Sequence, residues 1–210
     1  MFEYLLFDWD GCLADTLPIW YQGMKRGLLY FGIEATDTEI KKGFQTWEFF
    51  VDMGVTDLDL FTEAVYRHVT GCLDDVRFNE GVFDLLEQTN RRGIKAAIVT
   101  NTEQSKVRPV LSRLGAEQYF ECIIGREEVA KLKPDPEPVC MAMDKIGGQK
   151  EKTVMIGDSL SDVLSGKNAG IATVWYTPEN NIEYHLNRQD VEDTSPDIVI
   201  SHMKELETLM

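Results

Sequence analysis

The sequence predicts a doubly wound α/β fold with a mostly parallel, Rossmann-like sheet and one inserted helical unit. Six short apolar runs recur along the chain, and segments with helical periodicity separate most of them, as in a parallel sheet covered on both faces. Residues 17–79 break this alternation, because they contain helical patterns and no convincing strand. We therefore expect a core formed by residues 1–16 and 80–210 and a helical bundle formed by residues 17–79.

The apolar runs have the length and composition of buried strands. The first run, residues 4–7, ends directly before Asp8. The other runs cover residues 95–99, 121–124, 153–156, 171–174 and 197–200. Because these runs are mostly apolar instead of alternating with polar residues, they are typical of strands that are covered on both faces.

Helical periodicity predicts the elements between these strands. In the core the pattern covers residues 82–92, 103–114, 137–146 and 159–168, and in the insert it covers residues 18–31, 37–50 and 57–72. The first three core patterns each end at a glycine, the usual residue of a left-handed helix end. In the insert, Thr16 is a candidate N-cap and Pro18 suits a first helical turn. The polar residues 177–196 predict a surface excursion.

The charge of the chain restricts its partners. Lys and Arg number 21 and Asp and Glu number 36, which gives a formal net charge of −15. Such an acidic surface repels phosphate backbones and anionic lipid headgroups, so we expect neither nucleic acid nor a membrane as a partner. No stretch approaches the roughly 20 apolar residues of a membrane span, and the first residues lack a signal peptide's basic start. The four cysteines have no Cys-x-x-Cys spacing, which favours reduced thiols in a soluble, cytoplasmic protein.

Polar residues follow the predicted strands where each strand ends. They are Asp8, Asp10 and Gly11 after the first strand, Thr100 and Asn101 after the second, Lys131 and Lys133 in the loop after the third, and Asp158 and Asp162 after the fourth. The carboxyl ends of parallel strands meet at one edge of the sheet, where doubly wound proteins bind ligands. Carboxylates that meet there need cations, and Mg²⁺ and a lysine ammonium are suitable partners. This combination indicates a site that handles a phosphoryl group.

Four stretches carry a resemblance to a known family. They are residues 6–16 (LFDWDGCLADT), 99–101 (VTN), 133–136 (KPDP) and 156–162 (IGDSLSD). With the helical insert after the first of them, the chain resembles the haloacid dehalogenase superfamily of phosphohydrolases, and within it the phosphoglycolate-phosphatase-like branch. The resemblance implies that residues 17–79 form a cap domain. A threonine that is usual after the Asp-x-Asp-Gly motif is replaced here by Cys12.

The resemblance implies roles for the acidic residues. Asp8 would attack phosphorus and carry the phosphoryl group as an aspartyl-phosphate. Asp10 would protonate the leaving alcohol and then activate the hydrolytic water. The carboxylates of Asp8 and Asp158 and the backbone carbonyl of Asp10 would hold Mg²⁺. Asp162 would orient the metal's waters or the lysine from behind these ligands.

The resemblance also implies which residues bind the phosphoryl group. Thr100, Asn101 and the backbone amide of Gly11 would donate hydrogen bonds to its oxygens. A lysine would neutralise its charge, and we prefer Lys133 to Lys131 because Pro134 fixes an extended loop beside Lys133. In the cap, Lys42 is the candidate cation that meets the substrate.

The resulting functional prediction is a Mg²⁺-dependent phosphatase for a small phosphorylated metabolite of the phosphoglycolate or sugar phosphate type. A phosphomutase similar to β-phosphoglucomutase is one alternative, although Trp20 stands where those mutases have a histidine in the first cap helix. A phospho-receiver signalling module is the alternative from another class. Receivers place the phosphorylated aspartate on a middle strand and have no helical cap, whereas Asp8 follows the first strand. Phosphonate cleavage is disfavoured by Asp10, since its first motif usually lacks the second aspartate.

Overall fold

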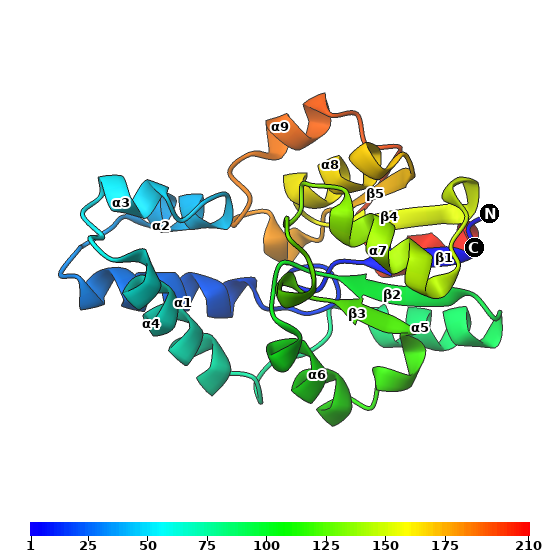
Figure 1. Ribbon diagram of the computed structural model, residues 1–210, viewed down its shortest axis with the longest axis horizontal. Coiled ribbons are helices and arrows are strands. Elements are labelled where there is room, and N and C mark those ends of the chain that lie inside the picture. The colour runs from blue at the N-terminus through cyan, green and yellow to red at the C-terminus, as the bar shows by residue number, and fades with distance from the viewer. The chain divides into compact units, whose positions relative to one another are not determined.

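The computed structural model describes residues 1–210, and its backbone contacts divide the chain into two compact units (Figure 1). The core unit comprises Met1–Asp15, Arg77–Ile182 and Asn187–Met210. The helical unit comprises Thr16–Val76 and Glu183–Leu186. The sequence predicted an insert at residues 17–79. In the structure residues 77–79 belong to the core unit instead, and Thr16 and Glu183–Leu186 belong to the helical unit.

Backbone hydrogen bonds explain why residues 77–79 belong to the core unit. The segment that leads into the helical unit and the segment that leads back to the core pair in an antiparallel bridge between Ala14 and Phe78. The amide of Asp15 donates to the carbonyl of Arg77 at 2.9 Å, and the amide of Asn79 donates to the carbonyl of Leu13 at 2.9 Å. The chain therefore returns to the core three residues earlier than the sequence predicted.

The core unit contains a six-stranded parallel sheet with the order β3-β2-β1-β4-β5-β6, which confirms the predicted doubly wound fold. The strands are β1 (Tyr4–Phe7), β2 (Lys95–Val99), β3 (Cys122–Ile124), β4 (Thr153–Gly157), β5 (Ala172–Tyr176) and β6 (Ile198–Ile200). All six predicted strands are present. Strand β1 lies between β2 and β4, with Phe7 in register with Ile98 on one side and Ile156 on the other. The strand order reverses at β1, which makes its carboxyl end a switch point.

Helices cover both faces of the sheet (Figure 1). In the core unit the helices are α5 (Val82–Arg91), α6 (Gln104–Arg113), α7 (Glu137–Ile146), α8 (Leu160–Ala169) and α9 (Arg188–Asp193), with 3₁₀ turns η2 (Glu117–Tyr119), η3 (Arg126–Glu128), η4 (Lys150–Lys152), η5 (Glu179–Asn181) and η6 (Met203–Thr208). On one face, α7 and α8 pack over a cluster that includes Leu6, Val99 and Met155. Because side chains alternate along a strand, Leu5 and Phe7 point to the opposite face, where α5 lies.

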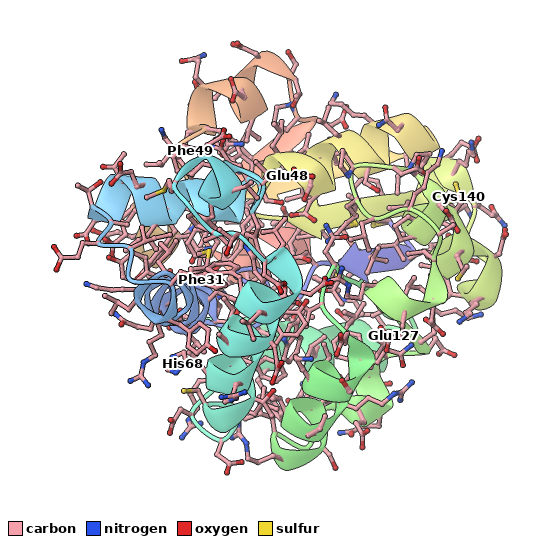
Figure 2. All side chains as sticks on the ribbon, turned by 60° about the vertical axis from the view of Figure 1, so that its left-hand side comes forward. Phe31, Glu48, Phe49, His68, Glu127 and Cys140 are labelled. Atoms are coloured by element: carbon pink, nitrogen blue, oxygen red, sulfur yellow. The ribbon has the colours of Figure 1, made fainter.

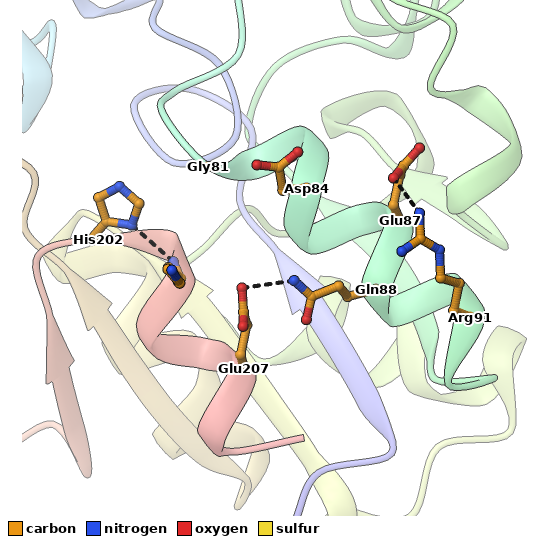
Figure 3. Close-up of a pocket in the computed structure, with 8 residues that line it drawn as sticks. Gly81, Asp84, Glu87, Gln88, Arg91, His202 and Glu207 are labelled. Atoms are coloured by element: carbon orange, nitrogen blue, oxygen red, sulfur yellow. Dashed lines mark hydrogen bonds and ion pairs between the residues drawn. The ribbon is translucent and has the colours of Figure 1, made fainter.

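A polar hollow of about 370 Å³ lies between α5 and η6 (Figure 3). It is lined by Gly81, Asp84, Glu87, Gln88, Arg91, His202, Lys204 and Glu207. Two contacts link its lining residues: Arg91 pairs with Glu87 at 2.7 Å, and the neutral amide of Gln88 donates to Glu207 at 2.8 Å. None of the residues that the sequence predicted for the active site lines this hollow.

The helical unit contains α1 (Leu17–Tyr30), α2 (Asp37–Lys41), η1 (Lys42–Phe44), α3 (Phe49–Asp52) and α4 (Leu58–Gly71). Its interior is aromatic, with the Phe61 ring centroid 5.2 Å from Phe50 and 5.4 Å from Trp47. Figure 2 shows Phe31 just beyond the end of α1 and Phe49 at the start of α3. No helix of the protein combines the length and the apolar character that crossing a membrane requires.

The predicted helix over residues 37–50 is wrong, because the structure breaks it after Lys41. The backbone approaches its neighbours closely at Gly43: a Cβ atom there would lie 2.3 Å from the Met24 sulfur and 2.6 Å from a ring carbon of Phe50. The chain turns at this glycine and brings Phe50 back into the aromatic interior, where it is fully buried. Packing of the large rings therefore overrides the helical periodicity.

Candidate active site

The carboxyl ends of three neighbouring strands carry the polar residues that the sequence singled out. Asp8 follows β1, Thr100 follows β2 and Asp158 follows β4, and all three are buried. The strand hydrogen bonding continues into these positions, since the Asp8 amide donates to Ile156 at 2.8 Å and the Thr100 amide donates to Ile124 at 3.0 Å. The sheet thus fixes the backbone of each residue and brings Asp8 and Asp158 together at the switch point.

Lys133 joins this group from the loop after β3. Its ammonium donates to Asp8 Oδ1 at 2.6 Å, to Asp162 Oδ1 at 2.6 Å and to the carbonyl of Val99 at 2.7 Å. These three acceptors use the three N–H bonds of the ammonium, and the side chain is only 2% exposed. Lys131, by contrast, is 73% exposed and pairs with Asp135 at 3.5 Å. Of the two candidate lysines, the structure brings only Lys133 to Asp8.

The cluster is electrostatically unbalanced. Burial raises the pKa of Asp8 well above its ordinary value, and the carboxylate of Asp162 adds to this rise while Lys133 opposes it. Burial disfavours the charged form of Lys133, but the attraction of Asp162 and Asp8 outweighs burial and raises the pKa of the ammonium. Three carboxylates, those of Asp162, Asp158 and Asp10, raise the pKa of Asp8, and the one ammonium of Lys133 lowers it. The site therefore has an excess of negative charge that a bound cation would neutralise.

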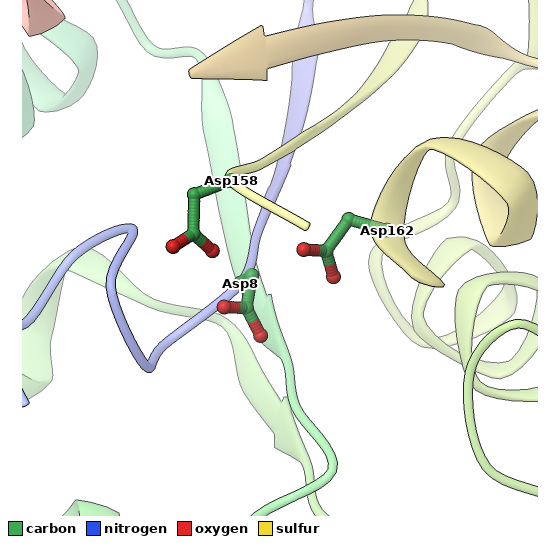
Figure 4. Close-up of side chains that lie close together, drawn as sticks. All are labelled: Asp8, Asp158 and Asp162. Carbon is green, nitrogen blue, oxygen red and sulfur yellow. The ribbon is translucent and has the colours of Figure 1, made fainter. Parts of the chain in front are cut away.

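Asp8, Asp158 and Asp162 have carboxylate oxygens within 4.8 Å of one another (Figure 4). Both oxygens of Asp162 already have protein partners, since Oδ1 accepts from Lys133 and Oδ2 accepts from the amide and hydroxyl of Ser159. Asp162 is therefore suited to hold Lys133 and the start of α8 more than to bind a metal directly. Asp8 and Asp158 remain as hard oxygen donors, and such donors fit a small divalent cation like Mg²⁺.

Asp10 is fixed by a residue that the motifs did not include. The hydroxyl of Thr102 donates to Asp10 Oδ2 at 2.6 Å. The amide of Thr102 in turn donates to the hydroxyl oxygen of Thr100 at 3.0 Å, so the Thr100 hydroxyl keeps its own proton to donate to a ligand. The segment after β2 therefore holds Asp10 and leaves the hydroxyl proton of Thr100 available to a ligand.

Gly11 and Asn101, which the resemblance implied as phosphoryl-binding residues, form hydrogen bonds with other protein groups. The Gly11 amide, expected to donate to phosphoryl oxygens, donates to the carbonyl of Ala14 at 2.8 Å. Gly11 has a φ of +80°, and a Cβ atom there would lie 2.1 Å from Asp158 Oδ2, so only glycine allows this approach. The side chain of Asn101 exchanges two hydrogen bonds with the backbone of Lys133, at 3.0 and 3.1 Å. Asn101 thus supports the lysine loop.

Two asparagines at the site were not predicted. Asn181 Nδ2 donates to the Gly11 carbonyl at 2.8 Å and to Asp158 Oδ2 at 2.7 Å. Asn79 Nδ2 donates to the same Gly11 carbonyl at 2.9 Å and to that of Cys12 at 2.8 Å. In the sequence, both residues look like turn-forming asparagines of polar segments, so no local signal distinguishes them.

Two predicted residues lie in the helical unit. Lys42 has its ammonium 4.4 Å from the ring centroid of Phe49, in a cation–π contact. Trp20, which occupies the position of the mutase histidine, packs with its ring centroid 5.6 Å from that of Tyr66 and 6.4 Å from that of Trp47. Trp20 is thus part of the aromatic packing of this unit, and its indole has no acid or base function.

Comparisons with known proteins identify a family and a shared fold. The family model of haloacid dehalogenase-like hydrolases matches residues 5–176. A pyrophosphatase PpaX from Oceanobacillus iheyensis is 29% identical over 212 residues, which cover 98% of this chain and 95% of that protein. A phosphoglycolate phosphatase from Agrobacterium fabrum is 24% identical over 209 residues, which cover 93% of this chain and 86% of that protein. A crystal structure from Lactobacillus plantarum shares the fold, with a TM-score of 0.86 at 18% identity and coverage of 100% of both chains.

Proposed function

The chain belongs to the haloacid dehalogenase-like hydrolase family, and on that premise we propose that it is a Mg²⁺-dependent phosphatase for a small phosphorylated metabolite. The family match confirms the resemblance predicted from the four motifs. The observation that carries the proposal is the buried group at the switch point, in which Lys133 bridges Asp8 and Asp162 beside Asp158. A nucleophilic carboxylate, a neutralising ammonium and hard oxygen donors are together what phosphoryl transfer requires.

The reaction would proceed in two steps. Asp8 attacks phosphorus, the bond from phosphorus to the leaving oxygen breaks, and an aspartyl-phosphate forms. Asp10 gives its proton to the leaving oxygen in this step and takes a proton from the hydrolytic water in the next. The water oxygen then bonds to phosphorus, the bond to Asp8 breaks, and inorganic phosphate is released. Thr102 would hold Asp10 between the two steps by its 2.6 Å hydrogen bond.

The other residues of the site would stabilise charge. Asp8, Asp158 and the backbone carbonyl of Asp10 would hold Mg²⁺, which supplies positive charge against the phosphoryl oxygens when bound. Lys133 would keep Asp8 ionised and supply positive charge beside the phosphoryl group as it transfers. Thr100 would donate its hydroxyl proton to a phosphoryl oxygen, and Asp162 would keep Lys133 in place.

The substrate class follows from the relatives and from the role proposed for the helical unit. One relative is a pyrophosphatase and another a phosphoglycolate phosphatase, so both act on small phosphorylated anions. We propose a substrate of the same kind, with the helical unit acting as the cap that selects the leaving group and with Lys42 as a candidate contact. Hydrolysis is favoured over a mutase reaction because Trp20 has no group that titrates.

The test is an assay of purified protein with pyrophosphate, phosphoglycolate and a panel of sugar phosphates. We expect release of inorganic phosphate that stops in excess chelator and returns with Mg²⁺. Asp8→Asn should keep the fold, since the side chains are nearly isosteric, and lose turnover, whereas the matched variant of exposed Asp144 on α7, Asp144→Asn, should keep it. Full activity in chelator or in Asp8→Asn would contradict the mechanism.

A second assay separates the hydrolase from the mutase. β-Glucose 1-phosphate is supplied with a bisphosphate primer, and both free phosphate and glucose 6-phosphate are followed over time. We expect no net isomerisation, because Asp10 is free to activate water and the aspartyl-phosphate is short-lived. If glucose 6-phosphate accumulates faster than free phosphate, the enzyme is a mutase.

A further inference from the structure

We propose that Asn181 is a positioning residue of this site, which holds the Asp158 carboxylate in the orientation that a divalent cation needs. This inference rests on the proposed function, because it concerns the same site. Asn181 belongs to none of the sequence motifs and lies in the segment after β5, which the sequence predicted as a surface excursion. The structure buries its side chain instead, with 2% of the residue exposed.

The contacts of Asn181 are specific. Its Nδ2 group donates one hydrogen bond to Asp158 Oδ2 at 2.7 Å and one to the Gly11 carbonyl at 2.8 Å. Both partners can only accept hydrogen bonds, so the amide must present its NH₂ group to them, and both of its N–H bonds are used. The side chain therefore ties the end of β4 to the loop after β1.

An amide is chemically suited to this task. A lysine next to Asp158 would neutralise the carboxylate, as Lys133 does for Asp8, and would compete with a cation. The neutral amide fixes one oxygen of Asp158 and leaves the negative charge in place. The backbone of Asp158 is fixed as well, because Trp175 Nε1 donates to its carbonyl at 3.0 Å. Together these bonds leave Asp158 little rotational freedom.

A second observation points to a ligand beside this amide. Asn181 Oδ1 is buried and accepts no hydrogen bond from any protein group. Turning the amide over would not solve this, because Oδ1 would then face the two acceptors. Buried acceptors in native proteins are usually satisfied, and a water molecule is the donor that fits a site without protein donors. Mg²⁺ sites in proteins typically keep several waters, so such an acceptor suits a hydrated cation site.

Because Asn79 shares one of the hydrogen-bond acceptors of Asn181, the effect of Asn181 on Asp158 can be measured without releasing the loop after β1. The Gly11 carbonyl accepts from Asn79 at 2.9 Å as well as from Asn181, so the loop after β1 stays tied when Asn181 is shortened. Asp158 Oδ2, however, loses the hydrogen bond that orients it. We therefore expect Asn181→Ala to weaken metal binding while the loop that carries Asp8 keeps its place.

The test measures Mg²⁺ affinity directly, by titration calorimetry on wild type, Asn181→Ala and the control Asn180→Ala. Asn180 is the adjacent, exposed asparagine, whose Nδ2 makes only 3.3 Å contacts, to Asp15 and Asn79. We expect Asn181→Ala to bind Mg²⁺ about 10- to 100-fold more weakly, the range for groups that orient metal ligands. Asn180→Ala should bind like the wild type. In the phosphatase assay, the Mg²⁺ concentration for half-maximal activity should rise by the same factor, and saturating Mg²⁺ should restore kcat to within a few-fold.

The possible outcomes are distinct. If wild type and Asn181→Ala bind Mg²⁺ equally tightly, the positioning role is wrong while the proposed function stands. If wild type binds no Mg²⁺, the metal site itself is wrong, and the positioning role falls with it. Circular dichroism checks the fold of each variant, and Asn181→Ser replaces Asn181→Ala if the alanine variant unfolds. A loss of kcat that saturating Mg²⁺ does not restore would also overturn the proposal.

Discussion

The two units of the molecule bury different kinds of side chain. The core unit buries Asp8, Lys133, Asp158, Asp162 and several other polar residues, whereas Thr16 is the one buried polar or charged residue of the helical unit, apart from Tyr21. The helical unit is instead filled by rings such as Phe50 and Phe61. Buried charges need precise partners and are costly when these are lost, while rings depend on shape and volume. Substitutions of buried residues should therefore lower both stability and activity in the core unit, and should act through lost packing in the helical unit.

The largest effect is expected when the ammonium of the core unit is removed. Lys133→Met leaves Asp8 and Asp162 buried without their common partner, and breaking a buried ion pair in this way costs about 3–5 kcal/mol. Activity should fall by at least about 10²-fold, as for other lost charge-stabilising donors. Urea unfolding at neutral pH and the phosphatase assay measure the two losses.

Lys131→Met is the matched control for Lys133→Met. The same residue type is removed two positions away, but the Lys131 side chain is 73% exposed and its contact with Asp135 is 3.5 Å long. Exposed ion pairs contribute about 0–1 kcal/mol, so stability and activity should stay close to those of the wild type. Equal losses of stability and activity in both lysine variants would contradict the different roles that we infer from the burial of the two side chains.

The next effect concerns the aromatic interior of the helical unit. Phe61 on α4 is fully buried against Phe50 and Trp47, and Phe61→Ala should cost about 3–5 kcal/mol through the cavity it leaves. Hydrogen exchange should accelerate first in α1 and α4 and only later in β1 and β4. Tyr30→Ala, at a position on α1 that is 63% exposed, should change little. Loss of protection in the sheet at the same rate would show that the units unfold together.

The smallest effect is a pH dependence in the helical unit. The Tyr21 hydroxyl donates to Asp37, and burial, followed by this bond, raises the pKa of Tyr21 to about 12 from an ordinary value of 10.0. The folded state thus holds this proton more tightly than the unfolded chain. The bond should contribute about 1–2 kcal/mol below pH 10, and this contribution should be lost as the pH rises towards about 12. The free energies of unfolding of wild type and Tyr21→Phe should therefore differ at pH 9 and converge as the pH approaches about 12, with Tyr30→Phe as the control.

The sequence predicted the sheet almost completely because each strand is a continuous apolar run. It also predicted which residues follow the strands, since Asp8, Thr100 and Asp158 stand directly after β1, β2 and β4. Helix ends in the core were predicted to within one or two residues. The helix over residues 37–50 was wrong because its break depends on the space around Gly43, which involves Met24 from another helix.

The motifs named residues that the structure brings together at the strand ends, such as Asp8, Asp158 and Lys133, but the sequence did not indicate the contacts between distant segments. Asn181 meets Asp158 across 23 positions and Asn79 meets Gly11 across 68, and no local pattern encodes such pairs. The engagement of Asn101 with the Lys133 backbone was missed for the same reason. Lys131 and Lys133 differ in the sequence only by their neighbours, and their burial distinguishes them.

Glu183–Leu186 belongs to the helical unit although it lies far from residues 16–76 in the sequence, and this limits how the unit can be exchanged between related proteins. Tyr184 packs its ring 6.1 Å from Tyr21 and 5.6 Å from Phe44, and Glu183 pairs with Lys41 at 3.1 Å. An exchange of residues 16–76 for the corresponding segment of a relative would keep Tyr184 but remove both of its ring partners. The helical unit is therefore not a single continuous segment of the chain. A chimera has to transplant two separate stretches of chain, or it leaves an aromatic side chain of the host without its partners.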